Sequence, residues 1–301
     1  MLSTILLSAV LAQSAPATAP SEPSPTPAAV PGPAGLEVIW SSSWDEAVEA
    51  AHKIPNGRVL VYFGDDDCGQ CRRMEALIWP STSFFAFTRD KVPVYEKFSG
   101  PEGKKLAATL RVKEIPAWVV VTPELLVSGR QVGPTSQMGW VQAFVEAEKG
   151  WYRYRKLRDD EKANPGDPRL VFDVALESFH RNGDSVAESR FQRLGSDPKT
   201  PPDLREQSLA YLATIQLDSE RPEDAGKSLD QLLSIAKEPR IRQRAELRRA
   251  DVDIALGRKD LAAARLRAFK KEWPDSPALP EVDRLLDAIS PTATKDADAP
   301  R

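Results

Sequence analysis

The strongest constraint on the fold is a segment at Val59–Arg72 that contains both cysteines of the chain. Its first part, Val59–Phe63, is an apolar run of strand length that is rich in β-branched and aromatic residues. Gly64 and three aspartates interrupt this run, and mostly good helix formers follow from Gly69 onward. The segment therefore predicts a buried strand, a short acidic turn and a helix that opens at the cysteines.

The spacing of Cys68 and Cys71 has a chemical consequence. A cysteine at a helix N-terminus meets unpaired backbone N–H groups and the positive end of the helix dipole, and both favour thiolate over thiol. The second cysteine lies one helical turn further on, within reach of the first for a disulfide. We therefore predict Cys68 as the nucleophile and Cys71 as the resolving sulfur.

The segment from about Leu36 to Lys149 resembles the thioredoxin superfamily. Four features carry the resemblance: the strand before the motif, Cys68-Gly69-Gln70-Cys71, Ile115-Pro116 before the apolar run Ala117–Thr122, and Gly133 before a last helix. The sequence around the motif, with Trp79-Pro-Ser and the paired Phe84-Phe85, is more similar to the periplasmic thioredoxin-like branch than to cytosolic thioredoxin.

This resemblance implies roles for individual residues. In that family the Ile-Pro bond is cis and its proline faces the active-site sulfurs, so Pro116 is expected to shape a groove for an extended substrate. The resemblance also implies a redox-active disulfide between Cys68 and Cys71. The other residues expected in the substrate groove are Gly69, Gln70, Ile115 and Gly133.

Two departures from the family pattern concern the chemistry. Asp67 stands where members usually carry Trp, and Tyr62 stands where cytosolic thioredoxins carry a buried acid that assists proton transfer from the resolving thiol. The aspartates at 65–67 are expected to raise the pKa of Cys68 by like-charge repulsion, against the helix dipole. At about 1 kcal/mol or less per exposed charge the two effects are comparable. Whether the pair oxidises, reduces or isomerises therefore stays open.

Composition excludes several function classes. The chain has 301 residues, enough for two domains, and 41 basic against 44 acidic residues, so no nucleic-acid partner is expected. The aromatic and basic run Trp151–Lys156 is followed at once by acidic residues, which favours a helix extension between domains. Two cysteines and two histidines are too few for a zinc site, so we expect neither a metal nor another cofactor.

The N-terminus is typical of an exported protein. Residues 1–17 contain an apolar stretch that is too short to span a bilayer, and an A-x-A cleavage site at 15–17. They lack Lys and Arg, so an apolar N-terminus of a cytosolic protein is the alternative. Residues 18–35 form a Pro-rich linker. We expect a cleaved signal peptide and a periplasmic or secreted protein, with a cytoplasmic location as the alternative.

Residues 36–150 are predicted as the thioredoxin-like α/β domain, and 151–167 as a linker or helix extension. Besides the motif strand, the strands expected are Leu36–Trp40, Val92–Phe98, Ala117–Val121 and Leu125–Val132. The helices expected are Ala47–Lys53, the motif helix, Lys104–Leu110 and Ser136–Lys149, with a turn or helix at Ser81–Phe87.

Residues 168–290 are predicted as an all-α helical-repeat domain, followed by a disordered tail at 291–301. The helix pairs are Pro168–Asn182 with Ser185–Leu194, Pro202–Asp218 with Pro222–Ala236, and Pro239–Leu256 with Asp260–Glu272, and Glu281–Ile289 caps them. Ala187, Ala225 and Ala262 recur at near-constant spacing. The last unit, Ala245–Pro277, resembles a tetratricopeptide repeat, which implies a face that binds peptides or partner proteins.

Three functions compete at this point. The first is an exported thiol–disulfide oxidoreductase that acts on protein substrates with thiols or disulfides, is served by a membrane redox partner, and uses its repeats to bind a further protein. The second is a non-catalytic interaction module on a thioredoxin-fold scaffold with a static disulfide. The third is a cytosolic thioredoxin-like chaperone with repeats. Both cysteines and Pro116 favour the first over the second, and the N-terminal segment favours it over the third.

Overall fold

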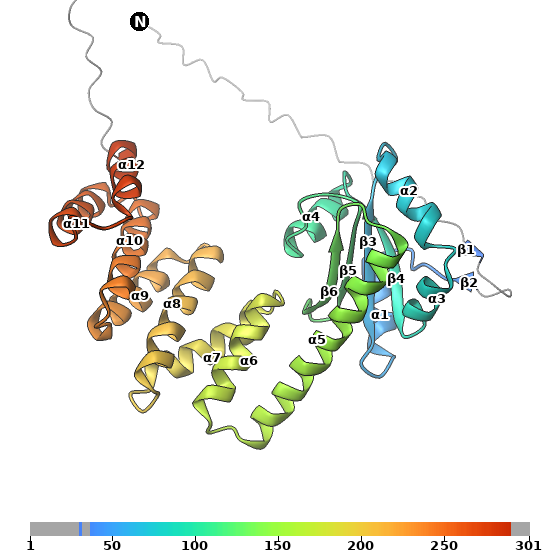
Figure 1. Cartoon of the computed structure of the whole chain (residues 1–301), viewed down its shortest axis with the longest axis horizontal. Coiled ribbons are helices and arrows are strands. Elements are labelled where there is room, and N and C mark those ends of the chain that lie inside the picture. The colour runs from blue at the N-terminus through green and yellow to red at the C-terminus, as the bar shows by residue number, and fades with distance from the viewer. Residues whose placement is uncertain (1–29, 32–36, 290–301) are drawn as a thin grey trace, which may run out of the picture.

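The computed structural model describes residues 30–31 and 37–289 of the chain. A small mixed sheet with helices on both faces resembles a thioredoxin-like fold, and an all-helical region follows it (Figure 1). The predicted signal peptide (1–17) and tail (291–301) lie outside the described residues. So does the predicted linker (18–35), except for Val30 and Pro31.

The main sheet has four strands in the order β4-β3-β5-β6. Their bounds are β3 Arg58–Gly64, β4 Lys91–Lys97, β5 Ala117–Val121 and β6 Val127–Val132. Strand β3 pairs in parallel with β4 and antiparallel with β5, and β6 is antiparallel to β5. The two central strands, β3 and β5, are buried along their whole length, which agrees with their continuous apolar sequences.

Two helical layers cover the sheet because successive residues of β3 point to opposite faces. Val59, Val61 and Phe63 pack against α1 (Trp44–His52) and α4 (Pro101–Thr109). On the other face Leu60 and Tyr62 pack against three helices. These are α2 Gly69–Ile78, α3 Thr82–Thr88 and the start of α5 Gln137–Ala163.

The strand predicted at Leu36–Trp40 does not join this sheet. Only Glu37–Val38 (β2) is a strand, and it pairs with Val30–Pro31 (β1) in a separate two-stranded sheet. The chain then touches the free edge of β4 once, where the Ser41 N–H donates to the Pro93 carbonyl at 2.8 Å. Pro93 has no N–H to return on that edge, so the ladder does not extend.

Other boundaries differ by a few residues. The edge strand begins at Val127 instead of Leu125, because Leu125 has a left-handed backbone (φ 66°) in a turn closed by its N–H on the Thr122 carbonyl. Helix α4 begins at Pro101 instead of Lys104, since proline suits the first turn of a helix.

Helix α5 continues through Gly150 to Ala163, well past the predicted end at Lys149. Its second half is held by tertiary contacts. Trp151 and Tyr154 are buried and form a small cluster with Leu126, and the Tyr154 hydroxyl hydrogen bonds to the Ser178 hydroxyl at 2.9 Å. One helix is therefore shared between the sheet and the helical region.

The helical region consists of α6–α12, which contact one another in chain order. The bounds are α6 Pro168–His180, α7 Asp184–Ser196, α8 Pro202–Asp218, α9 Pro222–Ile235, α10 Pro239–Ala255, α11 Lys259–Glu272 and α12 Leu279–Ile289. Ala187, Ala225 and Ala262 are fully buried, so the recurring small residues lie where helices pack closely. We call α6–α11 the helical array.

The turn between α6 and α7 joins the array to the sheet through Arg181. The Val127 N–H at the start of β6 donates to the Arg181 carbonyl at 2.8 Å. The Arg181 guanidinium in turn donates to the carbonyls of Val127 (3.3 Å) and Gly150 (3.0 Å). Backbone groups at the beginning of the edge strand are thus satisfied by the array.

The next residues of that turn reinforce the junction. The Asn182 side-chain amide donates to the Thr109 carbonyl at 2.8 Å, and Arg111 forms an ion pair with Asp184 at 2.8 Å. Thr109 is the last residue of α4, and Arg111 lies two residues beyond it. The array is therefore attached at the end of the sheet where β6 begins.

Glu96 on β4 is expected to make the stability of the domain depend on pH. It is 9% exposed, and burial, helped by the nearby Glu102 carboxylate, raises its pKa from 4.5 to about 7 against a hydrogen bond from the Trp44 backbone. The folded state holds the Glu96 proton more tightly than the unfolded state does. The protonated carboxyl therefore contributes its full stabilisation of the folded state below about pH 4.5, and this contribution is lost as the pH rises through 7. We expect Glu96→Gln to remove this loss.

Urea unfolding at pH 5 and pH 8 tests the expectation. At pH 8 the Glu96→Gln protein should gain stability relative to wild type, by at most roughly 3 kcal/mol, and at pH 5 the gain should shrink. Glu124→Gln, on the exposed turn before β6, is the matched control and should behave like wild type at both values. An equal effect of Glu96→Gln at the two pH values would contradict the assignment.

Candidate functional site

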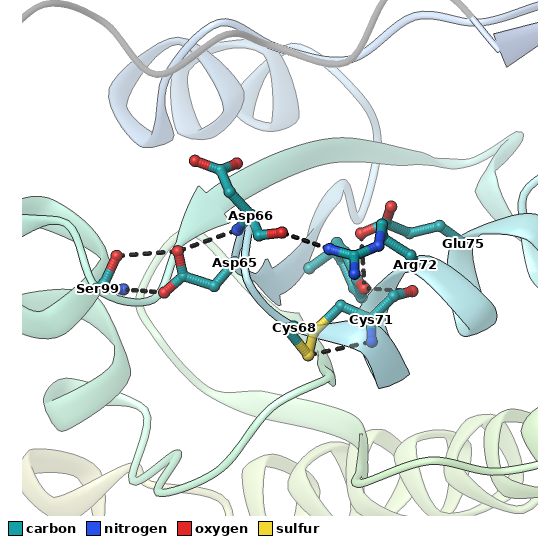
Figure 2. The surroundings of a disulfide bond; sticks show 8 residues. Asp65, Asp66, Cys68, Cys71, Arg72, Glu75 and Ser99 are labelled. Carbon is teal, nitrogen blue, oxygen red and sulfur yellow. Dashed lines mark hydrogen bonds between the residues drawn. A yellow bond between two sulfur atoms is a disulfide. The ribbon is translucent and has the colours of Figure 1, made fainter.

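The two cysteines lie where β3 ends and α2 begins (Figure 2). Cys68 is the N-cap residue of α2, and its sulfur accepts the Cys71 N–H at 3.1 Å. The two residues form a disulfide with their Cα atoms 5.2 Å apart. Cys71 is fully buried, whereas Cys68 is partly exposed. One sulfur of the pair is therefore accessible and receives a backbone N–H group that favours its anionic form.

Two of the three aspartates in the turn before Cys68 have partners on β4 or in the loop that follows it. The Asp65 carboxylate accepts hydrogen bonds from the Ser99 N–H and hydroxyl, both at 2.9 Å, and Asp66 forms an ion pair with Lys97. In the described chain Asp67 is exposed and forms no ion pair. Among the three aspartates, Asp67 is thus the one beside the disulfide whose carboxylate has neither a hydrogen-bond donor nor an ion-pair partner in the described chain.

The strand register brings the remaining predicted site residues to the same end of the sheet. Phe63 pairs with Ala117, and Ala117 pairs with Val132. The residues that precede Ala117 and follow Val132 therefore lie near the end of β3, from which the chain turns to Cys68. This juxtaposition depends on antiparallel pairing on both sides of β5.

Both loops at this end carry predicted groove residues. The Ile115–Pro116 peptide bond is cis, and Pro116 is buried. The Gly133 N–H donates to the Pro116 carbonyl at 2.8 Å, and Gly133 has a φ of 81°, which favours glycine. The loop that contains Gly133 also reaches α2, where the Thr135 N–H contacts the Met74 sulfur at 3.4 Å.

Gly69 and Gln70 complete the predicted groove residues. Both are exposed in the first turn of α2. Ile115 and Cys68 pack against the same apolar cluster. The structure therefore brings the predicted site residues to one end of the sheet.

The structure adds Glu75, a residue that the sequence analysis did not identify. The Tyr62 hydroxyl donates to the Glu75 carboxylate at 3.0 Å and lies 3.4 Å from the Cys71 carbonyl oxygen. Burial raises the pKa of Glu75, opposed by the Tyr62 hydrogen bond and by the Arg72 charge. Burial, together with the Glu75 charge, raises the pKa of Tyr62 as well. The spacing of four residues from Cys71 on a helix was the available signal.

Within 30–31 and 37–289, no group of three or more His, Cys, Asp or Glu side chains could hold a metal ion. None of the helices in these ranges combines the length and apolar character needed to cross a bilayer.

The fold and the cysteine pair define the class of site: a disulfide in a Cys-X-X-Cys motif at the start of a helix, on a small mixed sheet that resembles a thioredoxin-like fold. Among solved structures, the chain is similar to a solution structure of a thioredoxin from Thermus thermophilus. The sequence identity is 23% and the TM-score 0.30, and the match covers 35% of this chain and 82% of that chain. No protein-family model matches the sequence, and neither does any curated protein.

Proposed function

We propose that the protein is a thiol–disulfide oxidoreductase whose Cys68–Cys71 pair exchanges with thiols and disulfides of protein substrates. The observation that carries the proposal is the asymmetry of the pair. Cys68 is partly exposed at the helix N-cap and accepts an N–H group, whereas Cys71 is fully buried. This arrangement favours one attacking sulfur and one sulfur that only an intramolecular reaction can reach.

The reaction follows from these positions. In the reduced protein, the Cys68 thiolate attacks a substrate disulfide, forms a mixed disulfide and releases one substrate thiolate. The Cys71 thiolate then attacks the Cys68 sulfur, forms the Cys68–Cys71 disulfide and releases the second substrate thiolate. Two electrons pass from the protein to the substrate, and the same steps in reverse oxidise a substrate dithiol.

The helical array is assigned to partner binding, as in tetratricopeptide-like repeats. A hollow of about 560 Å³ lies between α8, α9 and α10, with Leu217, Leu229 and Leu232 among its lining residues. Export to the periplasm or beyond is proposed from the apolar stretch and cleavage site at 1–17. A membrane protein that restores the redox state of the pair fits that location.

Reduction of insulin disulfides by dithiothreitol tests the proposed function. The wild-type protein should accelerate this reaction by roughly tenfold or more, because an N-cap thiolate attacks faster than a free thiol of ordinary acidity. Cys68→Ser should give no acceleration. A wild-type disulfide that stays oxidised until the protein unfolds would overturn the proposal in favour of a scaffold with a static disulfide.

A further inference from the structure

Cys71 lies in surroundings that offer few groups able to take its proton. It is fully buried and belongs to the same cluster as Tyr62, Met74 and Trp118. A buried thiol still has to ionise before it can attack the Cys68 sulfur. The resolving step therefore needs a proton acceptor inside the protein.

Glu75 is the half-buried carboxylate one helical turn after Cys71 on α2. Residues four apart on a helix are neighbours on its surface, with Cβ atoms about 5–6 Å apart, and Glu75 follows Cys71 on α2 by four residues. Figure 2 shows Glu75 beside the helical turn that carries the disulfide. Its carboxylate is half-buried, whereas the aspartates at 66 and 67 are exposed.

Tyr62 fixes the position of this carboxylate. Its ring is fully buried and contacts Trp79, Tyr95 and Trp118, with ring centroids 5.6, 5.5 and 4.2 Å away. The hydroxyl has little freedom to move, and it donates to Glu75 at 3.0 Å while lying 3.4 Å from the Cys71 carbonyl oxygen. The carboxylate is thus tied to the turn of α2 that contains Cys71.

We propose that Glu75, held by Tyr62, accepts the proton of the Cys71 thiol during resolution of the mixed disulfide and returns it when the pair is reduced. This inference rests on the proposed thiol–disulfide exchange. The proton passes from the Cys71 sulfur to the Glu75 carboxylate, and the Cys71 thiolate forms a bond to the Cys68 sulfur. The bond between Cys68 and the substrate breaks, and the substrate leaves as a thiolate.

The charges around Glu75 agree with this role. Burial and the Asp66 carboxylate raise its pKa, whereas the Tyr62 hydroxyl and the Arg72 guanidinium lower it. Tyr95 on β4 also feels the Glu75 charge, and its own pKa is raised chiefly by burial. A carboxylate with a raised pKa is a stronger base for a thiol near neutral pH than an ordinary surface glutamate.

The test separates the two sulfurs in time. The reduced protein is mixed with one equivalent of dithiobis(nitrobenzoate), which releases one coloured thiolate when Cys68 attacks and a second when Cys71 resolves the mixed disulfide. Stopped-flow absorbance gives both rates across pH. Glu75→Gln should slow the second phase by about tenfold or more at neutral pH, with the first phase within about twofold of wild type. The deficit should narrow at high pH, where the thiol ionises unaided.

Tyr62→Phe provides an independent measurement if Glu75→Gln does not fold. The hydrogen bond from Tyr62 favours the charged carboxylate, so its loss should raise the pKa of Glu75. The pH midpoint of the second phase should therefore move upward, while the first phase keeps its midpoint. A second phase whose midpoint does not move in Tyr62→Phe would count against the role of Glu75.

Asp67→Asn is the matched control, because it also removes one negative charge near the disulfide but from an exposed position. It should quicken the first phase and leave the second unchanged. If Glu75→Gln slows both phases equally, or neither, Glu75 has no part in proton transfer and the inference fails. Absence of the first phase in wild type would instead sink the proposed oxidoreductase function.

Discussion

Replacing Cys71 by serine is expected to leave protein substrates covalently attached to Cys68. The Cys68 thiolate still attacks, but the serine hydroxyl cannot resolve the mixed disulfide, so the intermediate accumulates. Non-reducing electrophoresis and mass spectrometry of the variant, after incubation with an oxidised protein substrate, should show a one-to-one adduct that dithiothreitol releases. Only a trace of this adduct is expected from wild type.

Cys68→Ser is the matched control, because it leaves the other cysteine in place. Cys71 is fully buried, so this variant should form no adduct with the folded protein and should have no reductase activity. Adducts that form on Cys71 in the folded Cys68→Ser protein would show that the roles of the two sulfurs are reversed.

Truncating Trp118 to alanine should lower the free energy of unfolding by about 3–5 kcal/mol. This side chain is fully buried at the centre of the aromatic cluster on the disulfide side of the sheet. Its ring lies 4.2 Å from Tyr62, 5.6 Å from Phe84 and 5.8 Å from Trp140, measured between centroids. The cavity left by the indole cannot be filled without moving several of these rings.

Urea unfolding followed by circular dichroism measures this loss. Leu77→Ala is the control, because Leu77 lies on α2 over the same face of the sheet but is 47% exposed. It should cost less than about 1 kcal/mol. A loss of similar size in both variants would mean that the aromatic cluster does not dominate the stability of this face.

Much of the architecture was predictable because local signals agree with tertiary packing. Strand β3 and helix α2 follow from an apolar run, a glycine and a helix-opening cysteine. In the array, Pro202, Pro222 and Pro239 each stand in the first turn of a helix, where proline is favoured. The predicted bounds there agree with the observed helices within one or two residues.

The failures have tertiary causes. The helix expected at Ser136–Lys149 is longer than expected, because Trp151 and Tyr154, in the segment predicted as a linker or helix extension, are buried against Leu126. The strand predicted at Leu36–Trp40 does not pair with the edge of β4, because Pro93 on that edge has no N–H to donate. Neither effect is visible within a local window of sequence.

The site shows the same division. The cysteines and their expected order of reaction follow from their position at the start of a helix, but contacts with residues distant in the chain do not. Asp65 is engaged by Ser99, which is 34 residues away in the chain, and Glu75 acquires its environment from Tyr62 on β3. The sequence shows that Tyr62 stands where cytosolic thioredoxins carry a buried acid. In the structure the Tyr62 hydroxyl donates to a carboxylate from another position, Glu75.

The place where the array is attached sets its distance from the disulfide. The array is joined to the beginning of β6, whereas the disulfide lies at the end where β6 finishes, and a strand of six residues is roughly 20 Å long. Under the proposed function, a polypeptide bound next to this junction needs a free segment of about that length before its own cysteine meets Cys68. Under the same proposal, a substrate whose free segment is shorter than this distance gains no increase in its effective concentration at Cys68 from binding the array. A substrate whose free segment matches the distance gains the most. Under the proposed function, the position of the junction selects substrates by the distance between the segment that binds the array and the cysteine that reacts with Cys68.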